Sequence, residues 1–401
     1  MDAAQRLDIP LTVASELPST LEDREPGNFL TLDFRSPERA VEQTRRFHDA
    51  NAVGAVFGVD DDTAVLAARL SEALGLTSIS PAAAIAARDK FLQRTLLRAG
   101  GVPVPDFARY DLTVSAVDIA GRAPYPCVLK PVSLSASRGV IRADSPAELF
   151  RARERLAGIL THAGITGPDA TRFLVESYLP GSEYALEGLV DHGRLIPLAL
   201  FDKPDPLEGP FFEETIYLTP SGLPGAVQRE LVDCVRRAVW ALGIEWGPVH
   251  AELRYNGDGP WLIELAGRPI GGRCSGVLRF DGGCLDRPSS DLASLEEVHL
   301  AHAFGRLVEE PALEPEPSGV MMIPVPGAGA LRAIRGVQEA RQIGGVTDLV
   351  ITAHLGQVLV PLPEGSRYPG FIFARGETRD AVERSLRDAH AALRFELEPV
   401  P

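Results

Sequence analysis

The sequence predicts a multidomain protein of mixed α/β and α+β class, as its length, its N-terminal pattern and a proline-rich segment indicate. The chain has 401 residues, more than one hydrophobic core usually supports. Its N-terminal segment alternates helical and strand-like patterns, which is typical of parallel α/β packing. The acidic, proline-rich segment EEPALEPEPSG at 309–319 marks a boundary before a smaller α+β region. We therefore expect domains over 1–80, 81–308 and 309–401.

The elements follow from the periodicity of apolar residues. The chain starts at the end of a first helix followed by a strand, IPLTVAS, so we expect the N-terminal domain to lack an opening strand. A single helix is predicted over 80–100, with Ser80 as its N-cap and Gly100-Gly101 at its end. The other predicted helices are 36–50, 62–74, 224–243 and 377–391. The other predicted strands are 53–58, 76–79, 126–131, 172–179, 183–190, 194–201, 248–255, 260–265, 331–335 and 347–352.

The composition is that of an ordinary globular protein and excludes several classes. Hydrophobic residues make up 45% and charged residues 24% of the chain. No apolar run is long enough for a membrane span, and the N-terminus lacks the pattern of a secretory signal, so we expect a cytoplasmic protein without membrane contact. The net charge of −15 argues against nucleic acid as a partner. The cysteines are widely spaced, which predicts free buried thiols rather than a zinc site or disulfides.

Lysine is scarce in this chain and therefore informative. Of the 40 basic residues, only Lys90, Lys130 and Lys203 are lysines. A lysine kept against such a bias is expected where a compact ammonium is needed, although chance survival explains any one of them equally well. Lys130 ends a buried strand, YPCVLKPV, and the loop SLSASRGV follows it at 133–140. Small hydroxyl residues and glycine in such a loop expose N–H groups to phosphate, whereas the alternative is a plain hairpin turn.

Common nucleotide motifs are absent, which narrows the class of site. No lysine follows a glycine, so there is no Walker A loop, and GAGALR at 327–332 lacks the third glycine of a dinucleotide motif. The segment FLVESYLPGSEYALEG instead places Glu176 at a strand end and Glu183 at the start of the next strand. A carboxylate at the end of such a strand can accept hydrogen bonds from the adenine amine or the ribose hydroxyls. Alternation puts Glu183 and Glu187 on one face, although a solvated hairpin edge explains Glu187 equally well.

Two further glutamates form the strongest pattern in purely physical terms. In GPVHAELRYNGDGPWLIELAGRPIGG, a tight N-G-D-G turn joins two strands that carry Glu252 and Glu264. Pairing outward from the turn brings the two carboxylates close, and in apolar strands they repel unless a cation lies between them. Magnesium suits this arrangement. Arg268 follows on the glycine-containing loop and is expected to stabilise a transferring phosphoryl group, whereas the alternative is a partly exposed hairpin with unrelated acids.

Other residues are candidates for substrate binding. Lys203 lies in the long loop FDKPDPLEGPFFEETIYLTPSG, of a kind that is more often functional than structural. Glu213 and Glu214 of this loop are placed to bind an α-ammonium group, or else form a solvated acidic loop. His250 shares the face of Glu252, or else is a hydrogen-bonded core histidine. Backbone can approach a substrate closely at Gly271 and Gly272.

With these residues in order, the chain resembles the ATP-grasp superfamily, and within it the L-amino-acid ligases that join two amino acids. The resemblance covers essentially the full length and rests on the order Lys90, Lys130, SLSASRGV, Glu176 with Glu183, Glu252 with Glu264, and Arg268. FDKPDPLEGPFFEET, GGRCSGVLRF and PEGSRYPGFIFARG look like the amino-acid-ligase branch. The resemblance implies an ATP-grasp fold over 81–308, with a lid at about 110–180, a pre-ATP-grasp domain before it and a small C-terminal domain.

The resemblance also implies a role for each residue. Similar enzymes bind ATP and Mg²⁺, with Lys90 and Lys130 on the phosphates, Glu252 and Glu264 on the metal, and Arg268 on the γ-phosphate and then the acyl phosphate. The remaining nucleotide contacts would come from Ser133, Ser135, Ser137, Arg138, Gly139, Glu176, Tyr178, Leu179 and Glu183. The chain departs from many relatives at Ala266, where they carry Asn, and at Arg273, where they often carry an apolar residue.

The implied activity is ligation of a small-molecule carboxylate to an amine through an acyl phosphate. The first hypothesis is therefore the joining of amino acids, with release of ADP and phosphate. A second is another ATP-grasp reaction, such as carboxylation or ligation of a different acid. A third is an ATP-binding protein without catalysis. Ligases of this type are often dimers, so a homodimer is a further expectation.

Overall fold

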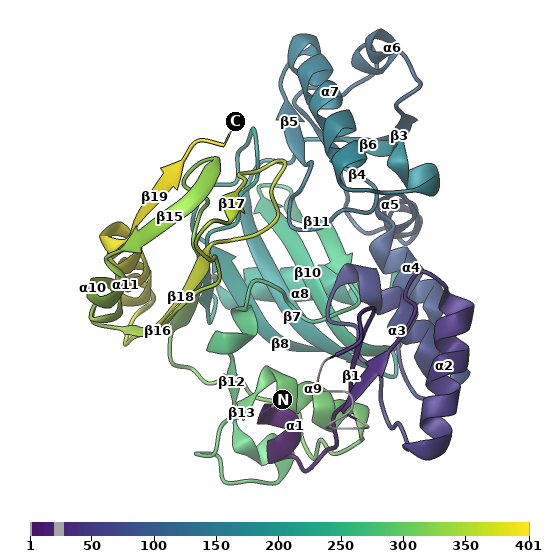
Figure 1. The fold of residues 1–401 in the computed structure, drawn as a ribbon, viewed down its shortest axis with the longest axis vertical. Helices are drawn as coiled ribbons and strands as arrows, with labels where there is room; N and C mark the ends of the chain where they lie inside the picture. The colour runs from purple at the N-terminus through teal and green to yellow at the C-terminus, as the bar shows by residue number, and fades with distance from the viewer. Residues whose placement is uncertain (1, 20–27, 401) are drawn as a thin grey trace.

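The computed structural model describes residues 2–19 and 28–400, and its N-terminal region is a small α/β unit (Figure 1). Two short strands pair in parallel within it. Its elements are α1 (Asp2–Arg6), β1 (Val13–Ser15), β2 (Phe29–Thr31), α2 (Pro37–Ala50) and α3 (Asp61–Ala73).

Two predicted strands of this region, at 53–58 and 76–79, are wrong. No strand is assigned to either segment, and the described part of the N-terminal sheet consists of β1 and β2. The amide of Val53 bonds to the side chain of His48, and that of Leu76 bonds to the Ser71 carbonyl, so both segments begin with local hydrogen bonds rather than a ladder. Val56 packs against the small core of this region, so the apolar pattern reported burial and not pairing.

The helix predicted over 80–100 is two helices, α4 (Pro81–Arg88) and α5 (Lys90–Ala99). Asp89 between them is extended, and its Oδ1 accepts hydrogen bonds from the amides of Phe91 and Leu92 at 2.9 and 3.0 Å. An aspartate that caps a helix in this way starts a new one instead of continuing the old. The break places Lys90 on the first turn of α5, where its side chain points into the molecule.

A second unit stands apart at the upper right of Figure 1. Its four strands pair antiparallel in the order β3-β6-β4-β5, and α6 and α7 contribute to its hydrophobic core. We call residues 107–177 the lid. The lid consists of β3 (Phe107–Asp111), α6 (Ala116–Ala120), β4 (Cys127–Pro131), β5 (Ile141–Ala143), α7 (Pro146–His162), η1 (Gly167–Ala170) and β6 (Arg172–Ser177).

An eight-stranded sheet of order β11-β10-β7-β8-β9-β14-β18-β16 forms the centre of the molecule. Helix α8 packs on one side through Leu231 and Val235, while the side chains of Ala185 and Phe201 belong to a second core that includes α9. The central elements are β7 (Ser182–Asp191), β8 (Arg194–Lys203), β9 (Ile216–Thr219), α8 (Gly225–Ala241), β10 (Trp246–Asn256), β11 (Gly259–Ala266), η2 (Cys274–Val277), β12 (Arg279–Phe280), η3 (Gly282–Leu285), β13 (Ala293–Ser294) and α9 (Leu295–Ala303).

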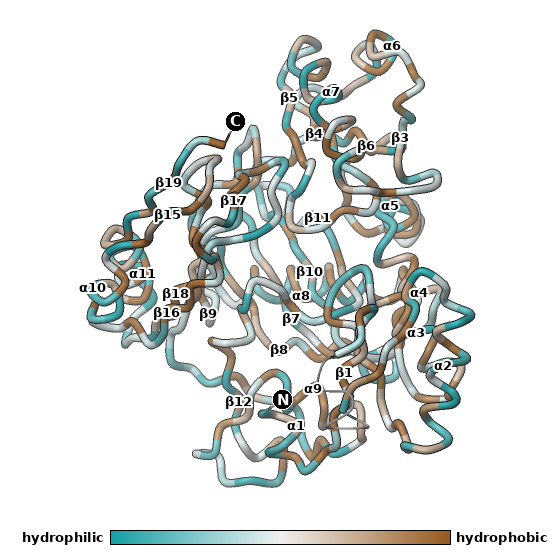
Figure 2. The backbone as a smooth tube through the Cα atoms, in the orientation of Figure 1, coloured by the Kyte–Doolittle hydropathy of each residue, from teal (hydrophilic) through white to brown (hydrophobic). Residues whose placement is uncertain are grey.

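The region after the proline-rich segment continues the same sheet. Strand β14 pairs with β9 on one side and with β18 on the other. Hydrophobic segments lie along β16 and β18, beside helices α10 and α11, whose trace alternates between the two colours (Figure 2). The elements of this region are β14 (Ser318–Met322), β15 (Gly329–Arg335), α10 (Val337–Arg341), β16 (Val346–Ile351), β17 (Val358–Leu359), β18 (Gly370–Arg375), α11 (Arg379–Ala392) and β19 (Arg394–Glu398). Among the described residues, no helix is both long and apolar enough to cross a membrane.

Candidate active site

A cavity of about 670 Å³ lies where the lid, the central sheet, the N-terminal unit and the C-terminal region meet. Most of the residues predicted for the site line it, although they come from widely separated segments. The predicted residues on its wall are Lys90, Lys130, Ser135, Ser137, Glu176, Tyr178, Leu179, Glu183, Glu214, His250, Glu252, Glu264, Arg268, Gly271 and Gly272. The predicted residues that do not line it are Ser133, Arg138, Gly139, Lys203 and Glu213.

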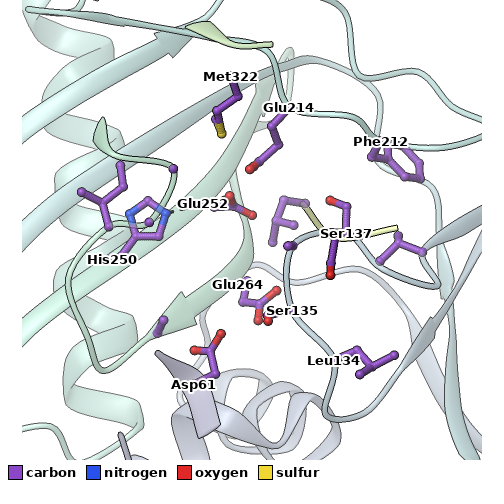
Figure 3. A pocket seen from close by; sticks show the side chains of 18 of the residues that line it. Asp61, Leu134, Ser135, Ser137, Phe212, Glu214, His250, Glu252, Glu264 and Met322 are labelled. Atoms are coloured by element: carbon purple, nitrogen blue, oxygen red, sulfur yellow. Dashed lines mark ion pairs between the residues drawn. The ribbon is translucent and has the colours of Figure 1, made fainter. Parts of the chain in front are cut away.

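The two glutamates of the hairpin face each other, as the turn predicts. Glu252 of β10 and Glu264 of β11 are direct partners in the antiparallel ladder, which has an irregularity immediately after Glu252. Figure 3 shows both carboxylates in the same part of the cavity. The Lys90 ammonium lies 2.8 Å from Glu264, and the Lys203 ammonium lies 3.0 Å from Glu252. Each carboxylate is therefore neutralised by one of the three lysines.

Lys203 lies at the centre of an acidic cluster. Its ammonium contacts Glu183 at 2.8 Å and Glu214 at 2.7 Å, in addition to Glu252. Burial lowers the pKa of Lys203, but the three carboxylates outweigh it and hold the pKa well above its ordinary value. These carboxylates lie close enough together to hold a metal ion, and the lysine ammonium lies among them. Lys203 thus supports the site from behind its wall.

Lys130 and Glu176 form a buried ion triad with Arg94, a residue that the sequence analysis missed. Glu176 accepts the Arg94 Nε at 2.8 Å through one oxygen and lies 2.6 Å from the Lys130 ammonium through the other. Burial, and then the charge of Arg94, lower the pKa of Lys130 to about 8. Burial raises the pKa of Glu176, but the two cations outweigh it and hold the pKa below its usual value. The role of Glu176 toward adenine or ribose stays a prediction.

The loop at 133–140 lines the cavity and forms hydrogen bonds with two other parts of the chain. Ala136, Ser137 and Gly139 have positive φ, which makes the loop turn sharply. The carbonyl of Leu134 accepts the Lys90 ammonium at 2.9 Å. Arg138 and Gly139 face away from the cavity and bond to the backbone of the C-terminal loop at 361–368, which explains why they do not line it.

Arg268 has a partner that no pattern in the sequence predicts. Its guanidinium donates to both oxygens of Asp61 at 2.7 and 2.8 Å, across 207 positions of the chain. Burial raises the pKa of Asp61, but the hydrogen bond and charge of Arg268 outweigh it, so the pKa lies below its ordinary value. Asp61 is the first residue of α3 and lines the cavity. The N-terminal unit therefore fixes the orientation of Arg268.

His250 links the cavity to a fully buried carboxylate. Its Nδ1 lies 3.5 Å from Glu187 and its Nε2 lies 3.9 Å from Glu252. Burial raises the pKa of Glu187 to about 7. Glu187 also accepts the amide of Ile270 at 3.0 Å and so holds the loop that carries Arg268. The shared face predicted for Glu183 and Glu187 is present, with Glu183 at the cavity and Glu187 beneath it.

The remaining candidates are Glu213, Glu214 and the two glycines after Arg268. Glu213 turns away and accepts the amide of Val325 at 3.0 Å, whereas Glu214 points into the cavity beside Met322 (Figure 3). Gly272 has φ +60°, a backbone conformation that favours glycine, and its missing Cβ leaves room for the sulfur of Met322. Side chains of the C-terminal region also line the cavity. Three of them lie in the quoted segment PEGSRYPGFIFARG, but none was predicted individually as a site residue: Met322, Thr352, His354, Gln357, Arg367, Tyr368 and Phe371.

Comparison with known families places this architecture in one class. Residues 1–77 match the ATP-grasp N-terminal domain, residues 123–277 the ATP-grasp domain, and residues 321–398 the L-amino acid ligase C-terminal domain 2. A solved structure with the same fold, an L-amino acid ligase from Bacillus licheniformis, superposes with a TM-score of 0.81 at 26% identity, covering 99% of this chain and 95% of that one. The chain belongs to the ATP-grasp superfamily.

Proteins with similar sequences include ligases. D-alanine–D-alanine ligase of Aromatoleum aromaticum is 30% identical, over 53% of this chain and 67% of that protein. Carnosine synthase 1 of Homo sapiens is 28% identical, over 66% of this chain and 34% of that protein. The chain spans between 27% and 61% of the length of the first three curated relatives that it matches.

Proposed function

We propose that the protein is an ATP-dependent carboxylate–amine ligase that joins amino acids through an acyl phosphate and releases ADP and phosphate. One observation carries the proposal: Glu252 and Glu264 face each other inside a cavity that Lys90 and Lys130 also line. This arrangement provides both the charges that hold a nucleotide triphosphate and the oxygen ligands that hold its metal. The family membership and the similarity to the Bacillus licheniformis ligase support the same activity.

The residues present fit a magnesium ion. Mg²⁺ prefers oxygen ligands and usually takes one or two carboxylates together with phosphates. Glu252 and Glu264 offer such oxygens, and the lysine ammonium beside each of them supports the proposal that positive charge is accommodated at this position. When bound, the ion would offset the negative charge of the β- and γ-phosphates. The side chain of Ala266, which stands where many relatives carry Asn, offers no ligand atom, so the two glutamates are the protein side-chain ligands that we propose.

The side chains around these glutamates then have separate tasks. Lys90 and Lys130 hold the phosphates, and the loop at 133–140 covers them and excludes water, which matters because an acyl phosphate hydrolyses readily. Arg268, fixed by Asp61, directs its charge toward the transferring phosphoryl group and later toward the oxyanion that forms when the amine attacks. The buried Glu187 keeps His250 and the Arg268 loop in place.

A direct test measures ADP release with single amino acids and with pairs, in the presence of ATP and Mg²⁺. We expect release that depends on a pair, with a dipeptide found by mass spectrometry. If no pair is active while bicarbonate or another acid stimulates turnover, the protein belongs to a different ATP-grasp reaction. Binding of ATP without turnover under any of these conditions would identify a nucleotide-binding protein instead. A cytoplasmic location and a homodimer stay predictions.

The pKa of Lys130 predicts how nucleotide affinity depends on pH. With a pKa of about 8, Lys130 is charged below this pH and loses its charge above it. Because a neutral amine cannot pair with phosphate, we expect the Kd for MgATP to be constant at pH 6.5–7.5. It should then rise toward about tenfold per pH unit above pH 8. Calorimetric titration across this range tests the expectation, because ATP itself does not titrate above pH 8. A Kd that stays constant to pH 9.5 would contradict it.

A further inference from the structure

Arg367 differs from every other arginine and lysine that lines the cavity. The others each pair with a carboxylate: Lys90 with Glu264, Lys130 with Glu176, Arg254 with Glu183 and Arg268 with Asp61. Within residues 2–19 and 28–400, no hydrogen bond or ion pair engages the guanidinium of Arg367. Arg367 is exposed, so its positive charge is solvated by water and is free to meet an anion at the wall of a cavity that is otherwise rich in acids.

The backbone that carries Arg367 is held at several points. The amide of Gly365 bonds to the Pro361 carbonyl, and a Cβ on Gly365 would meet the Val360 carbonyl oxygen at 1.8 Å, so the turn requires glycine. The Thr352 hydroxyl donates to the Tyr368 carbonyl at 2.9 Å and ties the other end of the loop to the end of β16. The loop therefore presents Arg367 from a defined position.

The lid forms hydrogen bonds and an ion pair with the same loop. The amide of Gly139 donates to the Pro363 carbonyl at 2.9 Å, and the Arg138 Nε donates to the Glu364 carbonyl at 3.0 Å. Arg155 of α7 donates to both carboxylate oxygens of Glu364, at 2.8 Å through its Nη2. Arg138 and Gly139 belong to the loop proposed to cover the phosphates, so that loop is hydrogen-bonded directly to the backbone that carries Arg367.

The position of Arg367 suits the free carboxylate of the amino acid that supplies the amine. The phosphates and the carboxylate that is phosphorylated belong near Glu264 and Arg268, where the charges are already matched. Arg367 lines the cavity together with Thr352, His354 and Gln357, which also come from the C-terminal region. An amino acid that supplies the amine enters with a free carboxylate, which needs a cation once it is removed from water. A guanidinium recognises a carboxylate through paired hydrogen bonds.

We propose that Arg367 binds the α-carboxylate of the amino acid that supplies the amine, and so selects amino acids over simple amines as the second substrate. This inference rests on the proposed ligase function. It assigns to the 361–368 loop a binding role that is separate from its contact with the lid.

The experiment compares an amino acid with its amide as the amine-supplying substrate, in the wild type, Arg367→Ala, Arg367→Lys and Arg273→Ala. Arg273 is the matched control because it is exposed at the same end of the molecule, stacks over Phe371 and does not line the cavity. For Arg367→Ala we expect the KM for the amino acid to rise at least about tenfold, the loss expected when a charged hydrogen-bonding partner is removed. The KM for the amide and the KM for ATP should change less than about twofold, within the range of a surface substitution. Arg367→Lys should recover part of the loss, and Arg273→Ala should resemble the wild type.

The possible failures are distinguishable. If Arg367→Ala leaves the KM for the amino acid unchanged, or raises the KM for amino acid and amide equally, the inference is wrong while the ligase function stands. If Arg273→Ala raises the KM for the amino acid as much as Arg367→Ala does, the effect comes from the overall positive charge of this region and not from a specific contact with Arg367. The inference is then again wrong. If the wild type joins no pair of amino acids at all, the proposed function fails and this inference fails with it.

Discussion

Replacing Glu264 by glutamine is expected to lower ADP formation on the order of 100- to 1000-fold, comparable to the removal of one preorganised electrostatic group. Glutamine keeps the shape of the side chain and can still accept the Lys90 ammonium, so the fold should be preserved. It removes the negative charge that faces Glu252, and with it half of the proposed carboxylate pair for the metal. The measurement is steady-state ADP release at saturating ATP and Mg²⁺.

The control for this prediction is Glu213→Gln. Glu213 lies next to Glu214 but turns away from the cavity toward the Val325 amide, so its loss of charge should leave turnover within about twofold of the wild type. If Glu264→Gln releases ADP at near the wild-type rate, the proposal that Glu264 binds the metal is wrong. Equal losses in both variants would show that turnover follows the total charge and not this pair.

The second large effect is on stability, in the variant Glu176→Gln. In the part of the chain that the structure describes, Glu176 supplies the only carboxylate in direct contact with both Arg94 and Lys130, and all three side chains are buried. Neutralising it leaves two buried cations side by side without the carboxylate that they share. Loss of one partner from a buried ion pair typically costs about 3–5 kcal/mol, and we expect a loss of this size in the free energy of unfolding. Urea denaturation followed by circular dichroism provides the measurement.

An exposed ion pair gives the matched comparison. Arg155 and Glu364 pair through two hydrogen bonds, but their side chains are 43% and 40% exposed. Solvent screens such a pair, so Glu364→Gln should cost at most about 1 kcal/mol. If Glu176→Gln and Glu364→Gln unfold at the same urea concentration, burial of the triad is not the source of stability that we infer.

The sequence predicted those parts of the site that depend on local rules. The N-G-D-G turn fixes the register of its hairpin, so the pairing of Glu252 with Glu264 follows from the spacing alone. The placement of Lys130 at the end of a buried strand was likewise predictable, because a buried lysine needs a partner of opposite charge. Asp89 was harder, because an aspartate within a helical pattern gives no warning that it will cap a new helix.

The parts that the sequence did not predict are contacts between distant elements. Arg268 meets Asp61 across 207 positions, and Glu176 meets Arg94 across 82 positions. In a chain that uses arginine as its main cation, neither Arg94 nor Asp61 stands out from its neighbours. These pairs depend on how separate units dock, which no local pattern encodes. The strands predicted at 53–58 and 76–79 are absent for a related reason. A run of apolar residues indicates that a segment is buried, but it does not indicate whether the segment pairs with a strand or packs as a loop.

The unbroken central sheet has a consequence for engineering this protein. Because β14 hydrogen-bonds to β9, residues on the two sides of the proline-rich segment share one backbone ladder. Val382 and Leu386 of α11 also pack against Ile216 and Leu218 of β9. A chimera that exchanges the C-terminal region with that of a relative would therefore also have to match the β9 edge, or it would expose a strand prone to aggregation. Exchange of the 361–368 loop alone is the more promising way to alter which amine is accepted.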